Sequence, residues 1–359
     1  MDWPLFGRAI ILSKPDFRMK SIKVLITREF SQDWVSHLRA RLPDRFEIIQ
    51  HTALKPNEID SEIWHSTEVL YSGACYPDPA DAPALRWVQL DTAGANHLLD
   101  TPLWRSKVKL TTLNGVAPPN MGEFALMMML AFGHHLPRLF AGQQNKEWPT
   151  LDERWDWYTP HELRGSTVGV IGYGNIGREI GRLAHAFGMR VLSVDRVRAG
   201  QANSLTYQIQ ELIGLPGTDP DVSFMPEELD LVLPQCDFVV VVLPYTTATH
   251  HMIGEKALRS MRPTAVLIDI ARGKIVDEEA LILALQEKWI AGAALDVFAE
   301  EPLPPSSPLW GMNNVIISPH VAGFTSHYYE RIMDLFSQNL LRYRNGEPLL
   351  NEVQRSRQF

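Results

Sequence analysis

The stretch of residues 167–195 constrains the fold of this chain more than any other part of the sequence. It opens with a short apolar run, passes through a glycine-rich turn at residues 172–177, and continues as a helix-like segment to a second apolar run that ends on Asp195. This order of strand, glycine turn, helix, strand and acid is the one that a dinucleotide-binding βαβ unit requires. We therefore predict a parallel α/β fold with a nucleotide site at the glycine turn.

The three glycines of the turn have predicted tasks in binding a pyrophosphate. Gly172 permits the tight turn, Gly174 lets the backbone approach the phosphates, and Gly177 allows the helix to pack closely on the strand. Asn175 and Ile176 lie between the second and third glycines and are also assigned to the cofactor site. The helix that follows offers free N–H groups and a positive dipole end to an anion.

The acid at the end of the second strand bears on the choice of cofactor. A carboxylate at Asp195 can accept hydrogen bonds from the adenosine ribose and would repel a 2′-phosphate, which favours NAD over NADP. Arg196 and Arg198 follow it closely and could attract that phosphate, so NADP stays open as an alternative.

Composition excludes several classes of protein. The chain has 359 residues, of which 45% are hydrophobic and 21% charged, as expected for two ordinary globular domains. A net charge of −8 without a long basic run disfavours nucleic acid and anionic membranes as partners.

The apolar run at residues 124–132 is far shorter than the roughly 20 residues that span a bilayer. Two cysteines are too few for a disulfide framework or a Cys-rich zinc site, so we expect no metal and a reducing, cytoplasmic setting.

Apolar runs alternate with helix-like segments along the chain, which predicts a mostly parallel sheet in each half. The expected strands are 23–27, 46–50, 69–72, 87–90 and 108–113 in the first half, then 238–243, 265–270, 291–296 and 315–317 in the second. A long helix from Met121 to about residue 135 joins the halves, and the Gly- and Pro-rich residues 196–231 are interpreted as a loop-rich insertion. Residues 1–22 are interpreted as a tail, and translation could begin at Met19.

Three polar residues directly follow late strands of the second half. These residues are Arg272, Glu301 and His320. The carboxyl ends of parallel strands meet at one edge of the sheet, where ligands bind, so we expect the three side chains to lie together. In the first half, the turns Ser72-Gly73-Ala74 and Gly94 also follow strands. Their backbone N–H groups are candidates for holding a substrate carboxylate, although ordinary turn glycines would look the same.

Several ordered motifs resemble those of the D-2-hydroxyacid dehydrogenase family. The matching stretches are the glycine turn, Leu243-Pro244, Ala271-Arg272-Gly273, Val276-Asp277, residues 294–298, Glu301-Pro302 and Pro319-His320. The resemblance runs from about Lys23 to Asn351, nearly the whole chain. It implies two doubly wound α/β domains, with a Rossmann NAD-binding domain (residues 121–321) inserted into a flavodoxin-like substrate or catalytic domain (residues 23–120 and 322–351). It also implies a homodimer.

The resemblance assigns roles to the polar residues. His320 would be the acid/base, Glu301 its carboxylate partner and Arg272 the substrate anchor, and each role has a physical basis. Arginine can grip a carboxylate in two places, and a nearby carboxylate favours the imidazolium that gives its proton to a ketone oxygen. Asp296 would lie by the nicotinamide carboxamide, with loop capping as the alternative. The family's remaining cofactor positions correspond to Pro244, Thr249, Ile270 and Ala271, together with Arg272 and His320 themselves.

The implied reaction is hydride transfer between NAD(H) and C2 of a 2-hydroxy or 2-oxo acid, with D stereochemistry. An NADPH-dependent glyoxylate/hydroxypyruvate reductase is one alternative, and an NAD-sensing, corepressor-like binding protein is a more distant one. Formate dehydrogenases carry glutamine where this chain has Glu301, which disfavours formate. Two departures from the family are the long insertion and Asp269, which stands where an asparagine is common.

Overall fold

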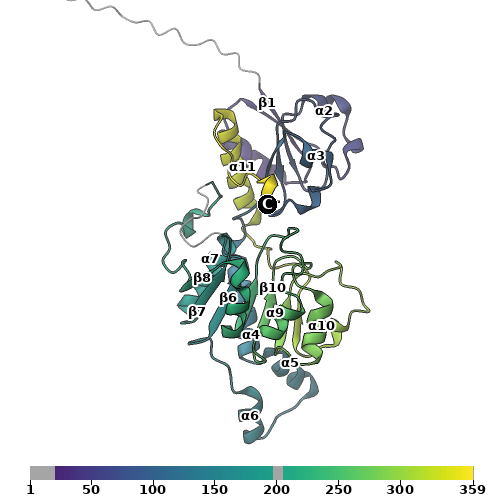
Figure 1. The fold of residues 1–359 in the computed structure, drawn as a ribbon. Coiled ribbons are helices and arrows are strands. Elements are labelled where there is room, and N and C mark those ends of the chain that lie inside the picture. Colours follow the sequence, from purple (N-terminus) through teal and green to yellow (C-terminus); the bar gives the residue numbers. More distant parts are fainter. Residues whose placement is uncertain (1–20, 197–204, 359) are drawn as a thin grey trace, which may run out of the picture.

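The computed structural model describes residues 21–196 and 205–358. The predicted tail up to residue 20, with the alternative start at Met19, and Arg198 lie outside the described residues. Two α/β units are stacked end to end, and the chain crosses between them more than once (Figure 1). The α/β fold predicted from the sequence is confirmed.

The first unit contains a five-stranded parallel sheet in the order β2-β1-β3-β4-β5. This is the flavodoxin-like order, which arises when successive βα units are wound to both sides of the first strand. Its strands are β1 (Ile22–Ile26), β2 (Phe46–Gln50), β3 (Val69–Ser72), β4 (Trp87–Leu90) and β5 (Lys109–Thr111). The helices of this unit are α1 (Gln32–Ala40), α2 (Ser61–Ser66), α3 (Pro102–Arg105) and α11 (Tyr328–Asn345).

Helix α11 comes from the other end of the chain, yet it packs on the first sheet beside α1 (Figure 1). Its apolar side chains, Phe336 and Leu340 among them, share a buried cluster with Val24 and Ile26 of β1. The opposite face of the sheet is covered by a second cluster that includes Leu25 and Leu70. Both faces are therefore covered, which explains why the central strands β1, β3 and β4 are mostly apolar.

The second unit contains a seven-stranded parallel sheet in the order β12-β11-β10-β9-β6-β7-β8. Six of these strands have the Rossmann order, whose direction of winding reverses between β6 and β9. The strands are β6 (Thr167–Ile171), β7 (Arg190–Val194), β8 (Val222–Phe224), β9 (Phe238–Val241), β10 (Val266–Asp269), β11 (Gly292–Leu295) and β12 (Val315–Ile317). Helices α4 (Pro118–Gly133) and α7 (Asn175–Ala186) cover one face, while α8 (Leu229–Val232), α9 (Glu255–Ser260) and α10 (Glu278–Gln286) cover the other.

Two details differ from the sequence-based expectation. Helix α4 begins at Pro118 and not at Met121, because proline is tolerated in the first turn of a helix, where its missing N–H costs no hydrogen bond. The insertion after β7 is not all loop, since Val222–Phe224 forms the edge strand β8. This strand is only three residues long and partly exposed, so it lacks the apolar run that reveals a buried strand.

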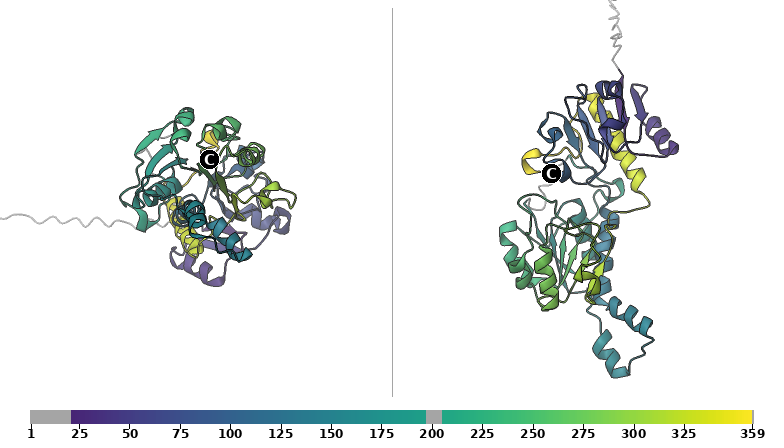
Figure 2. Two further views of the ribbon diagram at one scale, coloured as in Figure 1. Left: turned by 90° about the horizontal axis from the view of Figure 1, so that it is seen from below. Right: turned by 90° about the vertical axis from the view of Figure 1, so that its right-hand side faces the viewer.

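Helices α5 (Leu136–Asn145) and α6 (Leu151–Tyr158) project from the second unit as an arm (Figure 2). Large apolar side chains on this arm are exposed, with Phe140, Trp148 and Trp155 at 57%, 87% and 68%. No single helix of the described chain is long and apolar enough to cross a membrane. Helices α4 and α5 meet that length and composition only as a pair, and they are bent by 60° at the break between them.

Candidate active site

The glycine turn connects β6 to α7 and leaves open space where a pyrophosphate would lie. Gly172 has φ +104°, a conformation that side chains disfavour, and a Cβ on Gly177 would be 2.2 Å from the Gly172 carbonyl oxygen. At Gly174, by contrast, an added Cβ would meet no atom within 4 Å. Helix α7 starts next to this space without a side-chain cap, so its first N–H groups remain available for an anion. The turn therefore fits a dinucleotide phosphate.

The side chain of Asn175, the first residue of α7, is held from outside the turn. Its amide Nδ2 donates to the backbone carbonyl oxygen of Tyr207 at 3.3 Å and to the side-chain oxygen of Asn114 at 3.4 Å. The contact with Tyr207 was missed by sequence reasoning, because 32 residues separate the two and no local pattern links them.

Asp195 follows β7 and lies beside the same turn. Its carboxylate accepts a hydrogen bond of 2.6 Å from the backbone N–H of Tyr173, so it ties the turn to the end of the second strand. Arg196 is exposed next to it. The position of this acid is the one expected for a ribose-binding carboxylate.

The other predicted cofactor residues lie in the loops after β9 and β10. Thr249 is buried, and its hydroxyl donates to the carbonyl oxygen of the exposed Pro244 at 2.8 Å, which stabilises the loop after β9. Ile270 and Ala271 are buried directly after β10. These loops and the glycine turn share the carboxyl edge of the sheet, where a doubly wound fold binds its ligand.

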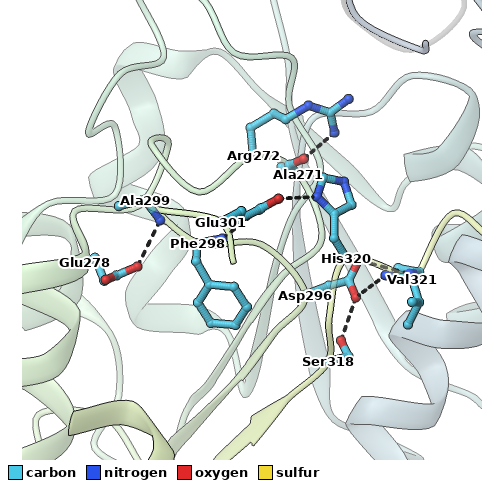
Figure 3. Close-up of polar contacts among 11 residues, drawn as sticks. Ala271, Arg272, Glu278, Asp296, Phe298, Ala299, Glu301, Ser318, His320 and Val321 are labelled. Atoms are coloured by element: carbon cyan, nitrogen blue, oxygen red, sulfur yellow. Dashed lines mark hydrogen bonds and ion pairs between the residues drawn. The ribbon is translucent and has the colours of Figure 1, made fainter. Parts of the chain in front are cut away.

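The three polar residues predicted to lie together are brought to that edge by three neighbouring strands. Arg272 follows β10, Glu301 follows β11 and His320 follows β12 (Figure 3). His320 Nδ1 lies 2.7 Å from Glu301 Oε2, and the other carboxylate oxygen of Glu301 accepts from the backbone N–H of Phe298 at 3.0 Å. The carboxylate is thus held at both oxygens, and it fixes the imidazole so that Nε2 is the nitrogen free to exchange a proton.

Asp296 makes three contacts that hold the chain on both sides of His320. Its carboxylate accepts from the Ser318 hydroxyl at 2.6 Å, from the Val321 N–H at 2.8 Å and from the Ala322 N–H at 2.9 Å (Figure 3). The side chain is buried, with 1% of the residue exposed. These contacts are those of loop capping, one of the two roles considered from the sequence, and the role beside the nicotinamide carboxamide stays a prediction.

Arg272 faces the first unit across the site. Its guanidinium is half-buried and donates to its neighbour's carbonyl oxygen, that of Ala271, at 2.6 Å. A Cβ built on Gly94 would lie 3.8 Å from Arg272 Nη2, so the turn after β4 approaches this arginine closely. The structure therefore brings the Gly94 turn and the arginine together, as a shared substrate carboxylate would require.

The turn after β3 has one buried residue and two exposed ones. Ser72 is fully buried, and its hydroxyl oxygen accepts from the Thr27 hydroxyl at 2.8 Å and from the Cys75 N–H at 2.9 Å. Its side chain is thus committed to shaping the turn. Gly73 and Ala74 are exposed, so their backbones remain accessible to a ligand.

His97 stands three positions after Gly94, in the segment that approaches Arg272 from the first unit. Its Nε2 lies 3.1 Å from the Tyr76 hydroxyl. Burial, and then the positive charge of Arg272, lower the pKa of His97 below its ordinary value. A neutral imidazole therefore borders the site from the first unit.

Fold and site together define a nucleotide-dependent two-domain enzyme with a histidine–carboxylate pair and an arginine at the dinucleotide edge. Residues 126–322 match the family described as D-isomer specific 2-hydroxyacid dehydrogenase, NAD binding domain. The glyoxylate reductase of Thermococcus gammatolerans is 34% identical over 333 residues, which cover 90% of this chain and 93% of that protein.

Solved structures of proteins from the same family are similar to this chain over nearly its whole length. A D-isomer specific 2-hydroxyacid dehydrogenase from Xanthobacter autotrophicus, in complex with NADPH and MES, has a TM-score of 0.75 at 28% identity and covers 95% of this chain and 100% of that one. A family member from Aeromonas salmonicida has a TM-score of 0.75 at 27% identity, covering 94% and 100%. The chain belongs to the D-isomer-specific 2-hydroxyacid dehydrogenase family. It is accordingly an NAD(P)-dependent oxidoreductase that acts on the CH–OH group of 2-hydroxy acids.

Proposed function

We propose that this enzyme interconverts a small D-2-hydroxy acid and its 2-oxo acid with NAD(H), using His320 as acid/base, Glu301 as its partner and Arg272 as substrate anchor. The observation that carries the proposal is the 2.7 Å contact between His320 and Glu301 at the same sheet edge as Arg272 and the glycine turn. A bound nicotinamide would supply or accept the hydride, and the protein supplies orientation and charge.

The protein's own residues account for binding and proton transfer. Arg272 would hold the substrate carboxylate through its planar guanidinium, helped by the backbone N–H groups of Gly73, Ala74 and Gly94. His320 Nε2 would give a proton to the C2 oxygen during reduction and take it back during oxidation. Glu301 keeps the imidazole oriented through its contact with Nδ1. Such proton transfer contributes about 10² to 10⁴ in rate.

The cofactor site would be formed by the glycine turn, the loops after β9 and β10, and Asp195. The acid after β7 favours NAD, because it would repel a 2′-phosphate. NADPH is the second candidate for two reasons. Arg196 is exposed beside Asp195, and the 28%-identical relative from Xanthobacter autotrophicus was solved with NADPH.

Glyoxylate is the substrate to test first, since the glyoxylate reductases of Thermococcus gammatolerans and Thermococcus onnurineus are 34% and 33% identical over nine-tenths of this chain. The experiment follows oxidation of NADH and of NADPH with glyoxylate, hydroxypyruvate, pyruvate and longer 2-oxo acids. Faster oxidation of NADH than of NADPH by one acid is the expected result. Preference for NADPH would overturn the cofactor assignment, and binding of NADH without reduction of any acid would favour the corepressor-like alternative.

The proposed domain division is residues 23–120 with 322–351 for the substrate domain, and 121–321 for the cofactor domain. Packing of α11 on the first sheet supports this division.

A cytoplasmic homodimer is proposed as well, with the exposed aromatic side chains of the α5–α6 arm as its contact surface. Nucleic acid and membranes are not among the proposed partners.

A further inference from the structure

One segment of the cofactor unit inserts two side chains into the core of the other unit. Residues 205–209 belong to the connection between β7 and β8 of the second sheet. Tyr207 and Ile209 are nevertheless only 3% and 7% exposed, and they lie in the same apolar cluster as Val116 and Phe336 of the first unit. The insertion thus reaches across the boundary between the two sheets.

Polar contacts attach this segment to the C-terminal part of the chain. The Tyr207 N–H donates to the side-chain oxygen of Asn351 at 2.9 Å, and the Asn351 N–H donates to the Leu205 carbonyl oxygen at 2.9 Å. The Tyr207 hydroxyl donates to Asp334 on α11 at 3.0 Å. Burial and the charge of Asp334 raise the pKa of Tyr207, so the hydroxyl keeps its proton and remains a donor.

The remaining polar group of Tyr207 contacts the glycine turn. Its carbonyl oxygen accepts from the Asn175 amide at 3.3 Å, at the start of α7. Gly115, which leads from the first sheet into α4, makes room for this carbonyl. Gly115 has φ +86°, and a Cβ there would lie 2.2 Å from the Tyr207 oxygen.

The side chain of Asn351 also binds the segment that leads from β5 into α4. Its amide donates to the carbonyl oxygens of Thr112 and Asn114 at 3.0 and 2.8 Å. Three chain segments therefore meet at Tyr207, namely the crossing into α4, the insertion and the C-terminal segment. A rotation of one unit against the other must carry all three segments or break these bonds.

We propose that Tyr207 is a positioning residue that links dinucleotide binding at the glycine turn to the relative orientation of the two domains. Its carbonyl oxygen orients Asn175, and its N–H and hydroxyl grip the substrate domain. A dinucleotide that orders the start of α7 thereby stabilises one arrangement of the domains, and breaking the grip weakens dinucleotide binding. The inference rests on the proposed cofactor site.

The test compares two tyrosines that make the same kind of bond. Tyr207→Phe removes the hydroxyl that binds Asp334 and keeps the ring and the carbonyl. Tyr343→Phe is the matched control, since the Tyr343 hydroxyl donates to Glu68 at 2.7 Å against the same apolar cluster but does not reach the second sheet. Both variants should lower Tm to a similar extent. Only Tyr207→Phe should raise the Kd for NADH, measured by fluorescence titration, by about threefold to tenfold.

Amide hydrogen exchange gives a second measurement, because the slowing of exchange by NADH does not depend on the stability of the protein alone. In the wild-type protein, NADH should slow amide exchange across residues 205–212, and this protection should be smaller in Tyr207→Phe. Asp334→Asn keeps an acceptor for the hydroxyl and should retain a Kd near the wild-type value. A Tyr207→Phe protein with lowered Tm but an unchanged Kd would overturn the inference.

Two further outcomes also test the inference: a Tyr207→Phe protein that does not fold, and a wild-type protein that binds no dinucleotide. If Tyr207→Phe does not fold, exchange in the wild-type protein decides, and protection of residues 205–212 that is indifferent to NADH overturns the inference. If the wild-type protein binds neither NADH nor NADPH, the cofactor site itself is wrong and the inference falls with it. Failure of the proposed function is thus distinguished from failure of the link.

Discussion

At the scale of single residues, the chemistry assigned to His320 depends on carboxylates that do not themselves react. Glu301 occupies Nδ1 at 2.7 Å and is itself held by the Phe298 N–H. Asp296 fixes the backbone after His320 through two N–H groups. Orientation of this kind fixes the tautomer and places Nε2, so the imidazole loses little freedom when substrate binds.

His320→Ala should lower the rate of 2-oxo acid reduction by about 10² to 10⁴, because the proton donor is lost. The Kd for NADH should stay nearly unchanged, since the glycine turn is untouched. Steady-state rates and fluorescence titration measure the two quantities. His327→Ala removes an exposed histidine that pairs with Glu330, and it is the control. A His320→Ala enzyme as fast as wild type would remove this residue from the chemistry.

Glu301→Gln should lower kcat by about tenfold to a hundredfold, because an amide replaces the charge-assisted bond to His320 while the bond to Phe298 can be kept. KM for the acid should change less, since Arg272 remains. Glu300→Gln, at an exposed neighbouring position, should leave kcat unaltered. Equal kcat for both variants would show that the carboxylate of Glu301 does not assist the histidine.

At the scale of elements, the carboxyl ends of β10, β11 and β12 deliver the three polar residues of the site. The end of β10 also carries a buried acid. Asp269 is 2% exposed, and its carboxyl oxygen accepts from the Ala271 N–H at 3.0 Å. Burial raises the pKa of Asp269 to about 8, so the folded protein keeps it protonated at neutral pH.

This acid makes stability depend on pH with a definite sign. Between the ordinary pKa of an aspartate, about 4, and the folded value of about 8, the folded state binds a proton that the unfolded state has lost. The free energy of unfolding therefore falls as pH rises through this interval, by about 1.4 kcal/mol per pH unit.

Asp269→Asn abolishes that proton and can still accept from Ala271, so its free energy of unfolding should not decline in this way. Denaturant unfolding from pH 5 to pH 8 measures the difference between the wild-type protein and the variant. The free energy of unfolding of Asp269→Asn should exceed that of the wild-type protein by an amount that grows steadily with pH. Asp44→Asn, at an exposed turn, is the control. Parallel pH profiles for all three proteins would contradict a buried, protonated Asp269.

At the scale of the whole molecule, the two units and the arm have different surfaces. The two sheets are covered on both faces by helices, whereas the α5–α6 arm projects away from them (Figure 2). Aromatic side chains of this arm are exposed. Trp148 and Trp155 are 87% and 68% exposed. Apolar side chains of this size are enriched at the centres of protein interfaces.

Replacing the two most exposed arm tryptophans, Trp148 and Trp155, with serine should convert a wild-type dimer into a monomer, because each replacement removes a large apolar contact. Sedimentation equilibrium across a range of concentrations measures the masses. Trp310→Ser removes a tryptophan that is 56% exposed but lies outside the arm, and it should leave the dimer intact. A wild-type monomer, or a dimer that survives the double change, would contradict the arm as the contact surface.

The sequence by itself determined the class of fold, most strands, the glycine turn and the three polar residues past β10, β11 and β12. These features follow from local patterns, because an apolar run or a glycine spacing acts through neighbours along the chain. Only the tertiary structure decided that Asp296 caps the segment after His320, that Ser72 is buried inside its turn, and that Tyr207 crosses into the other unit. Those contacts join residues 22 to 144 positions apart, so they depend on how the sheets are stacked and leave no periodic signal in the sequence.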